Sequence, residues 1–308
     1  MIANFFNKTN PINYVILLIV LLVLNFLFGF SNVSLAWYQV LGNQFLVFIL
    51  LAISLILLEQ LCQKKELTKN NSFAFLLATL FILFIPGVFT NINLTGSVFL
   101  VMLGIRRLMA IQGSKHMQTR LFDAALLILT GALLEFWAII FLVLVFYSIL
   151  ASGDYNYRNW IIPIFALLSV GVIYVSFCEW IGFDWHFWLS NKMKFSLQWN
   201  MDLQKHEAIG FTALSILMLF GTGNFLKSLP KKAINKKESY IKLAWAVAIG
   251  LIIFLTSFQK KPEQLLWMVF PAAILTANYL EKIQNKNLQN FLLWVITFFS
   301  FTMFYLQL

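Results

Sequence analysis

The feature that most constrains this chain is a series of eleven long apolar segments that occupy it almost from end to end. A helix needs about 20 apolar residues to cross a bilayer, and within lipid only helices and closed barrels satisfy their own backbone hydrogen bonds. With 61% hydrophobic and 11% charged residues, the chain has too few polar groups to cover a soluble globule. We therefore predict an all-α, polytopic transmembrane helix bundle that forms a single domain over residues 1–308. The predicted spans are 12–30, 44–62, 72–90, 95–111, 121–134, 136–151, 160–181, 209–226, 243–258, 264–281 and 290–307.

The apolar stretch 121–151 can be one long helix or two short ones. As one helix it would extend about 46 Å, well beyond the thickness of the hydrocarbon core. Charge favours two helices, because only that arrangement keeps the lysine-rich segment 227–242 on the cytoplasmic side, as the positive-inside rule requires. The sequence therefore predicts that 121–151 folds back on itself, with a tight turn at Glu135 near the outer surface.

The distribution of basic residues predicts the orientation of the bundle. Most of the 22 lysines and arginines fall in the connections assigned to the cytoplasm, which places the N-terminus inside and the C-terminus outside. We expect a multi-pass membrane protein. The predicted cytoplasmic residues are Lys8, Lys64, Lys65, Lys69, Arg106, Arg107, Lys115, Arg120, Arg158, Lys227, Lys231, Lys232, Lys236, Lys237, Lys242, Lys282 and Lys286, and the outer ones are Lys192, Lys194, Lys205, Lys260 and Lys261.

The longest predicted outer segment, 182–208, has an unusual alternation of residue types. Apolar and polar side chains alternate along 193–204, and apolar ones recur at every second position along 183–189. A period of two is typical of a strand, so one interpretation is an amphipathic hairpin on the outer leaflet or over a cavity mouth. The alternative is an interfacial helix or a coil anchored by tryptophans. In either case we expect Phe195, Leu197 and Trp199 to be buried beside lipid or protein.

Two outward carboxylates are candidate catalytic residues. Glu135 lies between two apolar runs and Asp184 begins the long outer segment. A carboxylate near a low-dielectric boundary can have a raised pKa and act as a base. The alternative is that an outward acid is simply a solvated loop residue. We favour this alternative for two other outward acids, Asp202 and Glu207. The outward acids are Glu135, Glu179, Asp184, Asp202, Glu207 and Glu263.

Lys260 and Lys261 form a pair that departs from the positive-inside pattern. Two ammonium groups at the outer lipid surface could bind a phosphate or pyrophosphate as point charges. The alternative is that both side chains extend from helix ends toward water. We assign the pair as candidate phosphate-binding residues.

The sequence indicates no metal site, no cofactor and no nucleic-acid partner. Three scattered histidines and two cysteines, Cys62 and Cys178, show no metal-ligand spacing. No Walker loop, Rossmann glycine pattern, HExxH motif or nucleophile elbow is present. The positive charge is divided among short loops, which fits membrane topology and attraction to anionic lipid better than nucleic-acid binding.

One stretch runs from Phe254 through Thr256–Ser257–Phe258–Gln259 to Lys260–Lys261, and continues as Leu265–Leu275 with Pro271 inside. This stretch resembles a late segment of C-type membrane glycosyltransferases. In that superfamily a basic residue at the outer face precedes an apolar helix that contains a proline. These enzymes take sugars from polyprenyl-phosphate carriers, so the resemblance implies that Lys260 or Lys261 holds such a phosphate.

A second likeness is carried by the residues from Leu121–Phe122–Asp123 to Glu135–Phe136–Trp137, and then by Tyr157–Pro163. Through them the whole chain resembles a family of polytopic inner-membrane proteins from Bacteroidota. The resemblance implies a multi-pass protein of the bacterial inner membrane and implies no activity. One departure from the glycosyltransferases is clear: they place an Asp or Glu in the first outer loop, whereas residues 31–43 contain no acid. Another carboxylate must replace it if the chain is a transferase.

Three functions follow from these observations. The first is handling of an isoprenoid-phosphate-linked substrate at the extracytoplasmic face, in the manner of a glycosyltransferase or a degenerate relative. The second is a non-catalytic structural or assembly role with other proteins of the cell envelope, for which 182–208 would be the docking surface. A transporter ranks third, because it should carry charged or broken helices near the midplane. Membrane lipid is an expected partner in every case.

Overall fold

The computed structural model describes residues 2–31, 37–111, 116–153, 156–196, 204–231, 234–258 and 260–308. Within these ranges the protein is all-α, as predicted, and the nearest approach to a strand is an isolated antiparallel bridge between Phe195 and Ser257. The helices are α1 Ile2–Phe6, α2 Pro11–Ser31, α3 Trp37–Lys64, α4 Phe73–Leu83, η1 Pro86–Thr90, α5 Ile92–Met109, α6 Met117–Leu134, η2 Phe136–Phe141, α7 Leu142–Ala151, α8 Tyr157–Ile181, α9 Trp185–Lys192, α10 Lys205–Leu226, η3 Leu229–Lys231, α11 Ile234–Thr256, η4 Pro262–Leu265, α12 Leu266–Leu280 and α13 Lys286–Gln307.

Every predicted span coincides with one of these helices or with a 3-10 and α-helical pair. Among the described residues, eight helices are long and apolar enough to cross a membrane, namely α2, α3, α5, α6, α8, α10, α11 and α13. The remaining three segments are shorter helices: α4, α12 and the pair η2–α7. The chain is thus a multi-pass membrane protein, while eleven crossings, the orientation and the particular membrane remain predictions.

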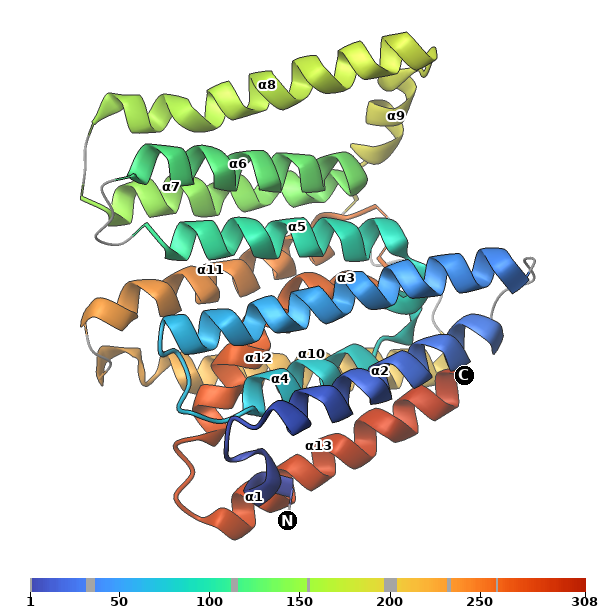
Figure 1. Cartoon of the computed structure of the whole chain (residues 1–308), viewed down its shortest axis with the longest axis vertical. Coiled ribbons are helices and arrows are strands. Elements are labelled where there is room, and N and C mark those ends of the chain that lie inside the picture. The colour runs from blue at the N-terminus through green and yellow to red at the C-terminus, as the bar shows by residue number, and fades with distance from the viewer. Residues whose placement is uncertain are drawn as a thin grey trace.

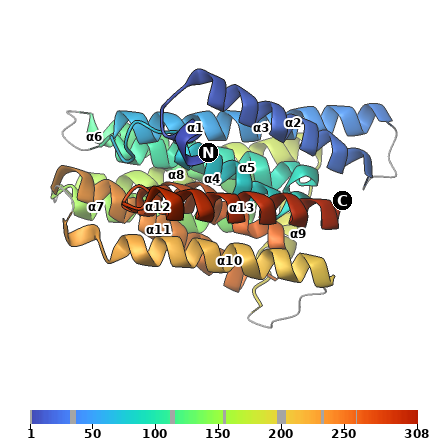
Figure 2. The same ribbon diagram turned by 90° about the horizontal axis from the view of Figure 1, so that it is seen from below.

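The long helices lie side by side and alternate in direction, so their ends gather at two opposite ends of the bundle (Figure 1). Seen from below, the helices still follow one common direction (Figure 2). The C-terminal ends of α3, α5, α7, α10 and α12 lie at one end, which we call the basic end because it carries the residues predicted to face the cytoplasm. The C-terminal ends of α2, α6, α8, α11 and α13 lie at the other, which we call the opposite end.

The core is formed by α4 and α12, two helices that have almost no exposed surface. All eleven residues of α4 are buried, and α12 is buried without interruption from Leu266 to Asn278. The outer helices show the reverse, since α8 exposes large apolar side chains such as Phe165, Ile173 and Phe177. Exposed apolar surface of this kind is what lipid, rather than water, solvates.

The predicted fold-back of 121–151 is confirmed. Helix α6 ends at Leu134, and Glu135 has an extended backbone with φ −131° and ψ 108° that interrupts the helical hydrogen bonds. The chain then turns through η2 into α7, which lies beside α6 and returns toward the basic end (Figure 1). Glu135 lies at the opposite end of the bundle, at the turn.

The hairpin interpretation of 182–208 is wrong over the described residues. Gly182 adopts the left-handed conformation, with φ 74°, and ends α8, and residues 185–192 then form the short helix α9. A lone hairpin is marginal without further strands, and the strand-like pairing among the described residues of this segment is the isolated bridge of Phe195 with Ser257. Phe195 is 58% exposed, so its expected burial against protein is also wrong, while contact with lipid stays a prediction. The expectations for Leu197, Trp199 and Asp202 lie outside the described residues.

Candidate functional site

The opposite end of the bundle contains a cavity of about 510 Å³, which we call the polar pocket. It forms where the start of α5, the turn between α6 and η2, the end of α9, the end of α11 and the start of α12 meet. Ionisable groups and amides share its wall with two tryptophans. The lining residues are Asn91, Leu94, Glu135, Trp137, Lys192, Lys194, Ile253, Ser257, Phe258, Lys261, Glu263, Gln264 and Trp267.

Glu135 enters the polar pocket because the helix is interrupted at this residue. Its side chain is 23% exposed, and the Lys192 Nζ lies 3.7 Å from its Oε1. Burial raises the pKa of the Glu135 carboxyl above its ordinary value, because a partly buried carboxylate loses solvation, and the charges of Lys192 and Lys261 oppose this change. Glu135 therefore combines the two properties of a candidate base, a raised pKa and a place beside cations.

Glu263 is a second carboxylate of the polar pocket, and the sequence had only counted it among the outward acids. The Asn91 Nδ2 donates a 3.0 Å hydrogen bond to its Oε2, which joins η4 to the start of α5. Its side chain also lies over Gly87 of η1, where an added Cβ would be 2.7 Å from Oε1, so a larger residue there would require the Glu263 side chain to shift. Burial raises the pKa of Glu263, and the Asn91 hydrogen bond and the charge of Lys261 partly offset the increase.

The predicted phosphate-binding pair is divided between two environments. Lys261 is exposed, lines the polar pocket and interacts electrostatically with both Glu135 and Glu263. Lys260 is only 5% exposed, and its Nζ donates to the carbonyl of Ser196 at 2.7 Å and to that of Ser257 at 3.3 Å. The extended backbone at Lys261 explains the division, because neighbouring side chains in an extended segment point in opposite directions.

Asp184, the second candidate catalytic carboxylate, is not part of the polar pocket. It lies in the connection between α8 and α9, where its side chain is exposed. The structure therefore brings together Glu135 and Lys261 of the four candidate residues, and adds Glu263, Lys192 and Lys194.

One side of the polar pocket is formed by two side chains from residues 185–196, and we call these residues the lid segment. Lys192 and Lys194 reach the pocket from it, and the Lys194 ammonium lies 6.0 Å from the ring centre of Phe258. The lid segment is attached to the end of α11 by the hydrogen bond from Ser196 N to the carbonyl of Thr256, at 3.3 Å. Lys260 adds the hydrogen bond to Ser196 described above, so its place in the site is that of an anchor for the lid segment.

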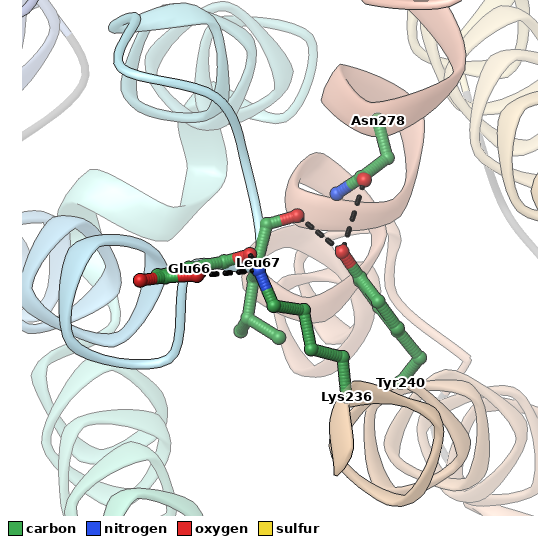
Figure 3. Close-up of polar contacts among 5 residues, drawn as sticks. All are labelled: Glu66, Leu67, Lys236, Tyr240 and Asn278. Atoms are coloured by element: carbon green, nitrogen blue, oxygen red, sulfur yellow. Dashed lines mark hydrogen bonds and ion pairs between the residues drawn. The ribbon is translucent and has the colours of Figure 1, made fainter. Parts of the chain in front are cut away.

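A second polar cavity, of about 660 Å³, lies at the basic end, and its polar groups are occupied with one another. The Lys236 Nζ lies 2.7 Å from Glu66 Oε2, and the Tyr240 hydroxyl donates to the carbonyl of Leu67 and approaches Asn278 Oδ1 at 3.2 Å (Figure 3). These contacts join the connection after α3 to α11 and α12. The cluster therefore has a structural role, because it fastens these segments to one another.

The two cavities are separated by packed apolar side chains. α11 and α12 contribute residues to both, and between them lie buried residues such as Ala246, Ile249 and Ala272. Gly250 lets α12 approach so closely that an added Cβ would be 2.6 Å from Met268 Cγ. This dry layer argues against a pathway through the bundle. Within the described ranges, no three His, Cys, Asp or Glu side chains gather as metal ligands would.

Comparisons with known proteins identify the family of the chain. The family model described as "Family of unknown function (DUF6427)" matches it over residues 1–308. No curated protein and no solved structure matches it significantly. Since the family model covers the full length of the sequence, the chain belongs to the DUF6427 family.

Proposed function

We propose that this protein handles an isoprenoid-phosphate-linked substrate in the polar pocket, with Lys261 binding the phosphate and Glu135 acting as a base. The observation that carries the proposal is the presence of both side chains on the wall of one cavity at the opposite end of the bundle. By the basic-residue count, that end faces the extracytoplasmic side. Glu135 supplies the carboxylate that the first outer loop of a C-type glycosyltransferase would otherwise provide.

The charge of the polar pocket supports an anionic ligand. Three lysines and two glutamates line it. Lys194 and Lys261 are exposed, and the Lys192 Nζ lies 3.7 Å from Glu135 Oε1, which is a long contact. A phosphate would draw these ammonium groups to itself through charge-assisted hydrogen bonds, which are about twice as strong as neutral ones. The tryptophans Trp137 and Trp267 add flat apolar surfaces against which a sugar ring can pack.

The proposed reaction is the transfer of a sugar from the lipid phosphate to an acceptor hydroxyl. Glu135 takes the hydroxyl proton while the acceptor oxygen forms a bond to the anomeric carbon. The bond from that carbon to the phosphate oxygen breaks, and the lipid phosphate leaves as an anion held by Lys261. A base works best when its pKa lies near the working pH, which is the direction in which burial changes the pKa of Glu135.

Binding of farnesyl phosphate to the purified protein tests the first part of the proposal. Lys261→Ala should weaken binding about tenfold, which corresponds to the loss of one charge-assisted hydrogen bond of about 1.4 kcal/mol. Lys205→Ala is the matched control, because Lys205 is an exposed lysine of the same end outside the pocket lining. Equal affinities of the two variants would overturn the assignment of Lys261.

The second part is tested by Glu135→Gln, which keeps the shape of the side chain and removes the base. This variant should bind farnesyl phosphate at least as tightly as the native protein while losing sugar transfer, measured by mass spectrometry of lipid-linked sugars in cells. Unchanged lipid-linked sugars in cells that lack the protein altogether would argue against transfer. They would favour the alternative, a structural subunit of an envelope complex, for which the exposed side chains of Met193 and Phe195 offer a docking surface.

A further inference from the structure

An apolar cavity of about 300 Å³, which we call the apolar groove, lies between α6 and α8 and is closed at one end by α9. Its wall is mostly apolar, with Leu133 of α6, Phe136 of η2, Val170 of α8 and Leu189 of α9 among its residues, and Tyr174 of α8 adds an aromatic ring. The groove is separate from the polar pocket and plays no part in the chemistry proposed above.

The groove exists because α6 and α8 pack closely along only part of their length. Toward the basic end they meet through a small cluster of buried residues, Ala125, Leu129, Ala166 and Val170. One residue further along α8, Gly171 carries no side chain, and a Cβ built there would meet no atom within 4 Å. In Figure 1, α8 diverges from α6 toward the opposite end, where α9 bridges the two helices.

Residues that are neighbours in the sequence line the apolar groove and the polar pocket. Glu135 and Trp137 line the polar pocket, while Phe136 between them lines the groove. On α9, Leu189 lines the groove and Lys192, one helical turn later, lines the pocket. The two cavities have no lining residue in common, but the turn after α6 and the lid segment each contribute residues to both.

We infer that the apolar groove binds the hydrocarbon chain of the same molecule whose phosphate the polar pocket holds, so that the ligand is a single-chain lipid phosphate. This inference rests on the proposed function. From Leu167 to Val175 the groove follows α8 for about 12 Å, which suits the first few isoprene units of a prenyl phosphate. Its volume accommodates one chain rather than the two chains of a common phospholipid.

Gly171→Leu is a sharp test, because Gly171 lines the groove and a Cβ at this position would enter open space. The leucine side chain is designed to occupy the groove in place of the ligand. The probe is farnesyl phosphate with a diazirine on its terminal isoprene unit, added to the purified protein in lipid nanodiscs. Native protein should be cross-linked on α8 between Val170 and Val175 or on the facing part of α6, and Gly171→Leu should reduce this labelling at least tenfold. Gly223→Leu on α10 is the matched control, since Gly223 also has no neighbour within 4 Å.

Competition with inorganic pyrophosphate separates this inference from the proposed function. Pyrophosphate binding should be unchanged in Gly171→Leu and weakened in Lys261→Ala. If Lys261→Ala weakens both ligands while Gly171→Leu binds the farnesyl probe like native protein, the groove inference is overturned and the phosphate site stands. If Lys261→Ala binds both pyrophosphate and the farnesyl probe as tightly as native protein does, the phosphate site is refuted, and the groove inference is refuted with it. Cross-links confined to other helices would also overturn the inference.

Discussion

Substitution of Gly221 by alanine should destabilise the bundle, because α10 and α12 touch at this residue. An alanine Cβ at this position would lie 1.9 Å from Thr276 Cγ2 and 2.8 Å from its Cβ, against an optimum of about 3.5–4.0 Å between carbon atoms. Thr276 cannot simply rotate away, since its hydroxyl donates to the carbonyls of Ala272 and Ala273 at 2.9 and 3.1 Å. Overpacking of this kind costs about 1–3 kcal/mol.

Gly223→Ala, two residues further along α10, isolates this packing cost. A Cβ at Gly223 meets nothing within 4 Å, so the gain in helix propensity of about 1 kcal/mol is common to both variants. The difference between them should be the overpacking alone, about 1–3 kcal/mol, measured by reversible unfolding in mixed SDS micelles followed by circular dichroism. Thr276→Ala should restore part of the loss in the Gly221→Ala background, because the closest atom is then gone. Equal stabilities for the Gly221 and Gly223 variants would refute the close approach of α10 to α12.

Three further predictions concern the opposite end and the orientation of the chain. Sulfate binding to the polar pocket should strengthen as the pH falls from about 8 to about 5. Glu135 and Glu263 have raised pKa values, so both lose their negative charge at a higher pH than ordinary carboxylates do. Glu135→Gln should therefore reduce the pH dependence of sulfate binding measured by calorimetry. Lys260→Met should make the lid segment more sensitive to limited proteolysis, since the side chain can no longer hold the Ser196 carbonyl, and native cleavage rates would contradict the anchor. A cysteine introduced at position 194 should react with an impermeant maleimide in intact cells, and a cysteine at position 237 should not. Both sites suit the assay, because Lys194 and Lys237 are exposed and the native cysteines are buried. The reverse labelling would show that the orientation is inverted.

The helices of this protein could be predicted from hydropathy because lipid imposes a simple rule on each segment separately. The eleven apolar segments all became helices, and a single charged residue between two apolar runs was enough to locate the turn at Glu135. These features depend on neighbours in the sequence. The alternation misled within the described residues 183–196 for the same reason, since a period of two specifies a strand only where partner strands exist.

The polar pocket was predicted only in part, because its geometry depends on residues far apart in the sequence. Glu263 acquires its position from Asn91, 172 residues earlier, and from the glycine at position 87. Which of two adjacent lysines faces the pocket depends on the backbone conformation of one residue, Lys261. No pattern in the sequence indicated the apolar groove, because the groove results from the absence of a side chain at Gly171.

The complete burial of α4 has a consequence for biosynthesis. α4 is made early, whereas α12 and α13, which pack against it, follow only after nearly all the intervening helices. With 11 residues it spans about 16 Å, roughly half the thickness of the hydrocarbon core, so on its own it is a poorly matched membrane segment. Until its last partners are inserted, α4 must be sheltered by lipid or by an insertion factor. A nascent chain interrupted before α12 therefore has an incomplete core, and membrane quality control should remove it.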